Sequence, residues 1–115
     1  MKTGVDLIAD ERRRQVEVEG WTPEHDDAHP MGALAVAGAC YAAIPGHTLY
    51  RVDTIPRQHQ AGGANTDYVF QEMWPWDAGW DKRRRTKTLR RLQKAGALIA
   101  AEIDRYLRAH PAEGE

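Results

Sequence analysis

Three stretches of the chain repeat apolar residues at helical spacing, with segments rich in proline and glycine between them. In the first stretch, Thr3 can cap a helix whose third position is Asp6. Apolar positions then recur every three or four residues until Gly20, which offers a left-handed stop (Val5, Ile8, Ala9, Val16). This pattern predicts a first helix between Thr3 and Gly20.

The second stretch follows Pro30 and consists largely of alanine and glycine. Pro30 fits the first turn of a helix, and Pro45 with Gly46 ends it. A helix built from such small side chains lets its neighbours approach closely, either in a monomer core or in a homodimer interface. The segment from Trp21 to His29 contains Thr-Pro and Asp-Asp, so we expect a structured corner before this helix.

The third stretch is the most regular, from about Arg84 to His110. Its apolar residues recur mainly at steps of three and four (Leu89, Leu92, Gly96, Ile99, Ile103, Tyr106, Leu107). From His47 to about Trp80 the periodicity is absent, and we expect the tryptophans at its end to pack back onto the helices (Trp74, Trp76, Trp80). The sequence therefore predicts one all-α domain over residues 1–115, a small bundle of three main helices with a long tryptophan-containing loop.

Cysteine content and hydropathy narrow the class of protein further. Cys40 is the only cysteine, which excludes an intrachain disulfide and a zinc site made of several thiolates. The most apolar window, residues 95–101, falls far short of the ~20 residues that a membrane span requires. We therefore expect a soluble, cytoplasmic protein with no membrane partner.

The net charge of −1 conceals two oppositely charged regions. Residues 1–30 carry eight acids, whereas residues 82–94 carry eight bases and no acid (Lys82, Arg83, Arg84, Arg85, Lys87, Arg90, Arg91, Lys94). The helix dipole does not favour positive charge at the start of the third helix. An anionic partner, either a triphosphate or a nucleic acid, is therefore one interpretation, and a solvated surface is the other.

The acids suggest a metal site, because Mg²⁺ and Mn²⁺ prefer several oxygen ligands shared with substrate phosphates. The candidate ligands come from the first helix, the corner and the third helix (Glu11, Glu19, Glu24, Asp26, Asp27, Glu102). The alternative is that each acid caps a helix or pairs with an arginine. A zinc helix using His25 and His29 is disfavoured, since prolines at 23 and 30 bracket the segment.

Three segments together resemble a known family. The strings ERRRQVEVEGWTPEHDDAHPMGALAVAGACYA, WPWDAGW and RRLQKAGALIAAEIDR are similar to the small phage and prophage proteins of the MazG-like, dATP/dGTP pyrophosphohydrolase-like family. The similarity covers residues 11–42 and 74–105 and leaves the middle of the chain unmatched. The Glu-Gly-Trp-Thr-Pro-Glu-His-Asp-Asp string is the most specific part of it.

The resemblance implies an all-α, MazG-like fold that hydrolyses a (d)NTP to (d)NMP and pyrophosphate with Mg²⁺ or Mn²⁺. It implies a metal site formed by five acids (Glu11, Glu19, Asp26, Asp27, Glu102). Three of them would also be catalytic (Glu19, Asp26, Asp27). It also implies that basic residues bind the phosphates, Lys94 being the one that matches the family pattern. We expect the substrate-binding residues to be Lys82, Arg91, Lys94 and Trp76. In a phage-encoded protein the compartment would be the host cytoplasm.

Two places depart from the family pattern: position 33, and the segment after Trp80, which reads Asp81-Lys82 where a tryptophan and a Lys-Pro are usual. Where the family has Gly-Glu-Leu-Ala, this chain has Gly32-Ala33-Leu34-Ala35, so the acid at the start of the second helix is missing. If that acid were a metal ligand, its loss would remove an oxygen ligand and most of the turnover. Two hypotheses follow: a pyrophosphohydrolase-related protein, active or degenerate, and a non-catalytic phage protein that binds a host protein or nucleic acid through its basic C-terminal helix.

Overall fold

The computed structural model of the protein describes residues 1–44 and 73–114, and within these ranges the chain forms helices and no strand. This confirms the all-α prediction. The predicted long loop lies mostly outside the described residues, since 45–72 are not among them. The described residues form four α-helices and three short 3₁₀ turns (α1 Gly4–Glu17, α2 Pro23–Asp27, α3 Ala33–Ala42, α5 Thr88–Ala109, η4 Ala78–Trp80, η5 Arg83–Arg85, η6 Pro111–Gly114).

Helix α1 begins at a capping box. The Thr3 hydroxyl accepts a hydrogen bond from the Asp6 backbone N–H at 3.3 Å, and the Asp6 carboxylate accepts one from the Thr3 N–H at 2.8 Å. The helix ends at Glu17, and Gly20 follows in the left-handed region with φ of 76°. The predicted start and stop signals of this helix are therefore both used.

Helix α3 begins later than its sequence pattern predicts. Met31 and Gly32 have φ angles of 66° and 73°, so the backbone cannot be helical at these two positions. Pro30 therefore lies in a turn before the helix, and the prediction that it occupies the first helical turn is wrong. Gly32 is the N-cap residue, and Ala33 is the first residue of α3.

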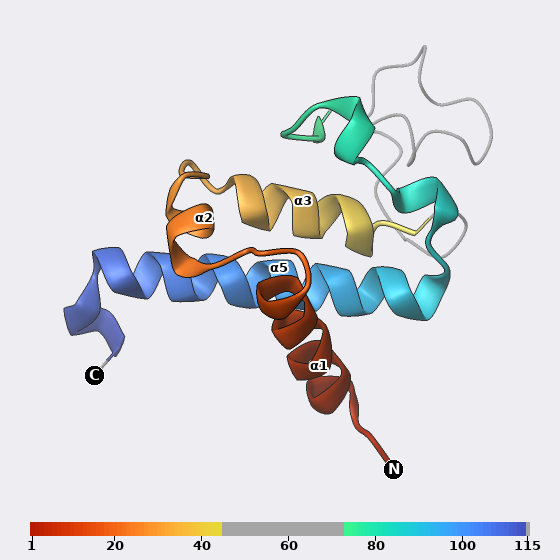
Figure 1. Ribbon diagram of the computed structural model, residues 1–115, viewed down its shortest axis with the longest axis horizontal. Coiled ribbons are helices and arrows are strands. Elements are labelled where there is room, and N and C mark those ends of the chain that lie inside the picture. Colours follow the sequence, from red (N-terminus) through yellow and green to blue (C-terminus); the bar gives the residue numbers. More distant parts are fainter. Residues whose placement is uncertain (45–72, 115) are drawn as a thin grey trace, which may run out of the picture.

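The other described α-helices contact α5, which is the longest of them (Figure 1). Helix α3 lies along α5 in the opposite direction, α1 crosses it, and α2 lies near its C-terminal half. Gly96 allows α1 to approach, because a Cβ atom at this position would lie 2.4 Å from Ile8 Cδ1. The core lies mainly between α3 and α5 (Leu34, Ala37, Tyr41, Ala95, Leu98, Ala101).

The tryptophan segment is partly packed onto this core. Trp74 and Trp76 contact it, together with Trp21 from the segment after α1. Trp80 remains 60% exposed, unlike its expected packing. No helix within the described ranges combines the length and apolar character needed to cross a bilayer.

Arg91 ties the C-terminal end of α3 to the start of α5. It is buried, and its guanidinium donates hydrogen bonds to the carbonyl oxygens of Cys40, Tyr41 and Ala43 at 3.1–3.2 Å. These carbonyls belong to the last turn of α3, where no intrahelical donors remain. Part of the basic run thus has a structural role.

We predict that Arg91→Leu lowers the free energy of unfolding by about 3 kcal/mol, because buried carbonyls lose their donors. Urea denaturation followed by circular dichroism measures this change. Arg85→Leu is the matched control, since Arg85 is exposed in η5 and its loss should stay within about 0.5 kcal/mol. Equal denaturation midpoints for the two variants would contradict the structural role of Arg91.

Candidate functional site

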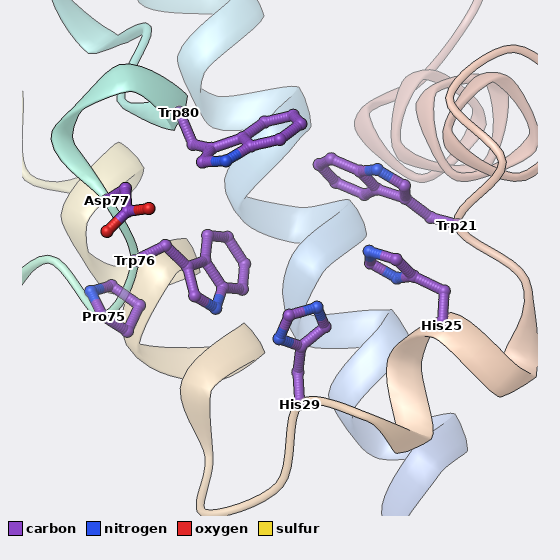
Figure 2. Close-up of a pocket in the computed structure, with 7 residues that line it drawn as sticks. All are labelled: Trp21, His25, His29, Pro75, Trp76, Asp77 and Trp80. Carbon is purple, nitrogen blue, oxygen red and sulfur yellow. The ribbon is translucent and has the colours of Figure 1, made fainter.

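An aromatic pocket of about 440 Å³ opens between the corner after α1 and the tryptophan segment. Figure 2 shows its lining, with the side chains of the corner on one side and those of the tryptophan segment on the other (Trp21, His25, His29, Pro75, Trp76, Asp77, Trp80). Its volume lies in the range of small-molecule sites, and aromatic walls with a few polar groups are typical of such sites. We refer to it below as the aromatic pocket.

The corner positions its rings through local hydrogen bonds. The Trp21 backbone N–H donates to the Gln15 carbonyl at 2.9 Å, which fixes the turn after α1. The Thr22 hydroxyl caps α2, where Pro23 is the first residue. As a result the Trp21 and His25 rings stack in parallel, with centroids 5.5 Å apart.

A buried ion pair orients His25. Asp26 is fully buried, and its Oδ2 accepts a hydrogen bond from Arg12 at 2.8 Å. Its Oδ1 lies 3.0 Å from His25 Nδ1, so the Nδ1–H tautomer of His25 donates to Asp26. Asp26 therefore anchors the pocket wall to α1.

His29 continues the wall although α2 ends at Asp27. Its ring centroid lies 4.7 Å from that of His25 and 5.3 Å from that of Trp76. The Trp76 indole N–H is buried and has no hydrogen-bond acceptor within the described part of the chain.

A second group of charges lies at the crossing of α1 and α5. Glu11 is 1% exposed, and Arg14 donates to both of its oxygens, at 2.8 and 3.0 Å. Arg90 NH2 lies 2.6 Å from Oε1 of the same carboxylate, and Lys94 Nζ lies 3.9 Å from Oε2. We call Glu11 with Arg14, Arg90 and Lys94 the cationic cluster.

Glu19 connects the cationic cluster with the aromatic pocket. Arg14 NH1 donates to Glu19 at 2.7 Å, and this bond is the main cause of the lowered pKa of Glu19; the charges of Lys82 and Lys94 lower it further. In sequence, Glu19 is two residues from Trp21 and Lys82 two residues from Trp80, both of which line the pocket. The cationic cluster is thus linked to the pocket through Glu19, which pairs with Arg14 and precedes the pocket residue Trp21 by two positions.

The cationic cluster carries excess positive charge. Burial lowers the pKa of the Lys94 ammonium, Glu11 opposes this, and the charges of Arg14 and Arg90 lower the pKa further. Three cations thus face the single Glu11 carboxylate, with Glu19 nearby. Such an arrangement attracts an additional anion.

The remaining candidate metal ligands pair with arginines at other places. Asp27 accepts from Arg108 at 2.8 Å, and Glu102 accepts from Arg105 at 2.6 Å. Glu24 is exposed on α2. Across residues 1–44 and 73–114, no group of three or more histidine, cysteine, aspartate or glutamate side chains is placed to hold a metal ion.

These acids do not fit a magnesium ion as they are arranged. A divalent ion at Glu11 would stand among Arg14, Arg90 and Lys94. At about 4 Å and an effective dielectric constant of about 20, each such cation would repel it by roughly 8 kcal/mol. A Mg²⁺ or Mn²⁺ ion could therefore bind these acids only after their ion pairs with the arginines had opened.

The predicted substrate-binding residues divide between two places. Trp76 lines the aromatic pocket, Lys94 belongs to the cationic cluster and Lys82 is exposed, whereas the guanidinium of Arg91 holds the end of α3. The sequence did not indicate a role at the site for Trp21, Asp77 or Arg14. The spacing of Glu11 and Arg14, three apart on one helix, was the available signal for their pairing.

Comparisons with known proteins identify no relative. No protein-family model matches the chain. No curated protein and no solved structure matches it significantly. The MazG-like resemblance therefore remains a prediction from the sequence.

We predict that Glu11→Gln lowers the free energy of unfolding at pH 7 by about 2–4 kcal/mol, because three cations lose their buried counter-charge. Urea denaturation measures this value. Glu17→Gln, an exposed acid of the same helix, is the matched control and should change stability by less than about 0.5 kcal/mol.

The same variant should change the dependence of stability on pH. Burial raises the pKa of Glu11, but the Arg14 hydrogen bond and the charges of Arg14, Arg90 and Lys94 outweigh it, so the folded pKa is below the ordinary 4.5. The stabilisation is therefore present above about pH 4.5 and is lost as the pH falls through the folded pKa. Denaturation curves between pH 7 and about pH 3.5 should show a smaller acid loss for Glu11→Gln than for wild type, and parallel losses would contradict the pairing.

Proposed function

We propose that this protein binds a nucleoside triphosphate, with the base in the aromatic pocket and the phosphates on the cationic cluster. The observation that carries the proposal is the position of these two features. A pocket walled by three tryptophans is linked, through Glu19 two residues before Trp21, to a group of cations that exceeds its buried counter-charge. A nucleotide combines the two chemistries, a flat aromatic base and a polyanion, at a short fixed separation.

The pocket suits a flat base because its walls are ring faces and edges. Stacking on aromatic side chains contributes about 1–3 kcal/mol per base and tolerates any base. One polar group gives orientation: the exposed Asp77 carboxylate, a lining residue, would accept a hydrogen bond from an exocyclic amine.

The phosphates would be bound by partly exposed cations. The side chains of Arg14, Arg90 and Lys94 keep 29%, 37% and 19% of their exposure, so each can reach a ligand while it remains near Glu11. Arginine offers paired donors to phosphate oxygens, and lysine offers a point charge. Lys82 is also exposed, and its positive charge acts on Glu19, as that of Lys94 does.

Hydrolysis to (d)NMP and pyrophosphate is the activity that the MazG-like resemblance implies. The contacts described above support the binding half of that function, whereas its metal-dependent half rests on the resemblance alone. Incubation with each dNTP and Mg²⁺ or Mn²⁺, followed by assay of pyrophosphate, tests it. Release above a no-enzyme control establishes a pyrophosphohydrolase, and nucleotide binding without release establishes a binding protein.

We predict that Trp80→Ala weakens nucleotide binding by about 5- to 150-fold, corresponding to one lost stacking partner. Trp80 is 60% exposed, so the fold should tolerate the change. Calorimetric titration with dATP and dGTP measures the affinity. Trp74→Phe is the matched control, since Trp74 packs against Tyr41 and is not among the pocket-lining residues; equal affinities for wild type and Trp80→Ala would remove the pocket from the binding site.

A second function is favoured by the exposed part of the basic run. Lys82, Arg84, Arg85 and Lys87 face solvent around η5, although Arg83 and Arg91 are buried. Such a group suits the backbone of a nucleic acid or an acidic surface of a host protein. Binding to single-stranded DNA that weakens steeply with salt and is lost in Arg84→Glu/Arg85→Glu, but not in Trp80→Ala, would select this function instead.

A further inference from the structure

Arg14 stands between two carboxylates of the site. Its Nε and NH2 atoms donate to the two oxygens of Glu11, and its NH1 atom donates to Glu19 at 2.7 Å. The guanidinium therefore joins an acid of α1 to an acid just beyond the end of that helix. A metal ion shared by the two carboxylates would have to lie in the same place.

Two neighbouring cations further disfavour a metal ion at this place. Arg90 and Lys94 approach Glu11 from α5, so the buried carboxylate has cations on α1 and α5. The pKa of Arg14 is raised, mainly by its hydrogen bond to Glu11 and also by that to Glu19, against the effect of burial. Arg14 thus keeps its charge at every pH at which the protein is folded.

We infer that Arg14 replaces a divalent metal ion between Glu11 and Glu19, so that this protein binds its nucleotide without Mg²⁺. That the ligand is a nucleotide rests on the proposed function. That Arg14 stands in place of a metal ion rests on the side-chain contacts described above. Mg²⁺ ordinarily neutralises the phosphates at nucleotide sites. Here Arg14, Arg90 and Lys94 supply fixed positive charge in its place.

The first experiment measures nucleotide affinity by calorimetry in EDTA and in excess Mg²⁺. We expect the dissociation constants of wild-type protein to agree within about twofold. An affinity at least tenfold higher with Mg²⁺ would overturn the inference while leaving the proposed function intact. Absence of binding in both buffers would contradict the proposed function, and the metal experiment below would then decide the inference alone.

The second experiment titrates Mn²⁺ into nucleotide-free protein and follows the electron paramagnetic resonance signal of the free ion. Wild-type protein should leave the signal unchanged at millimolar Mn²⁺. Arg14→Gln/Arg90→Gln removes two of the cations and should bind one equivalent. Stoichiometric Mn²⁺ binding by wild type would overturn the inference, and so would a folded double variant that gains no Mn²⁺ binding.

Two controls keep these outcomes interpretable. Arg13→Gln removes an exposed arginine that pairs with Asp10 on the same helix, and it should gain no Mn²⁺ binding. Circular dichroism establishes that the double variant is folded. If it is not, the two wild-type measurements decide the inference without it.

Discussion

The arrangement of the helices depends on the ion pairs of one buried carboxylate, that of Glu11. It joins α1 to α5, because Arg14 belongs to its own helix while Arg90 and Lys94 belong to the other. A charge this deeply buried is tolerated only when it is paired and hydrogen-bonded. The side chain of Gln15, also buried, adds a further hydrogen bond to Glu11 at 3.3 Å.

This cluster also fixes the position of the aromatic pocket. Once α1 is held on α5, the Gln15 carbonyl binds the Trp21 N–H, and the corner places Trp21 and His25 against each other. Asp26 then connects this corner to α1 by its ion pair with Arg12. Helix α1 therefore contributes one cation of the cluster, Arg14, and also the contacts that shape the pocket wall, so the cluster and the pocket are structurally coupled.

The sequence predicted the elements better than the contacts between their side chains. Helical periodicity located α1, α3 and α5, and the caps at Thr3 and Gly20 were readable because they act within a few residues. The start of α3 was missed because the left-handed backbone at Met31 is not a preference of its side chain. Met31 is 94% exposed, so no apolar burial of its side chain marks the turn in the sequence either.

For the site, the sequence showed which residue types were present but not which charges would meet. The acids suggested metal ligands, and the basic run suggested a partner, when each was considered alone. In the structure, Arg90 and Lys94 of the run meet Glu11, an acid about 80 residues earlier, and Arg108 meets Asp27 in the same way. A pairing at such separation leaves no periodic trace in the chain.

The arginine pairing also bears on the departure at position 33, where the MazG-like resemblance predicts an acid and this chain has Ala33. A site with one oxygen ligand fewer holds a divalent ion less well, while its remaining carboxylates still need positive charge. Arginines within reach satisfy that need without depending on the concentration of a free ion. If the proposed relationship holds, Ala33 and the Arg14 bridge between Glu11 and Glu19 agree with each other, because a chain without that ligand carries its own cation.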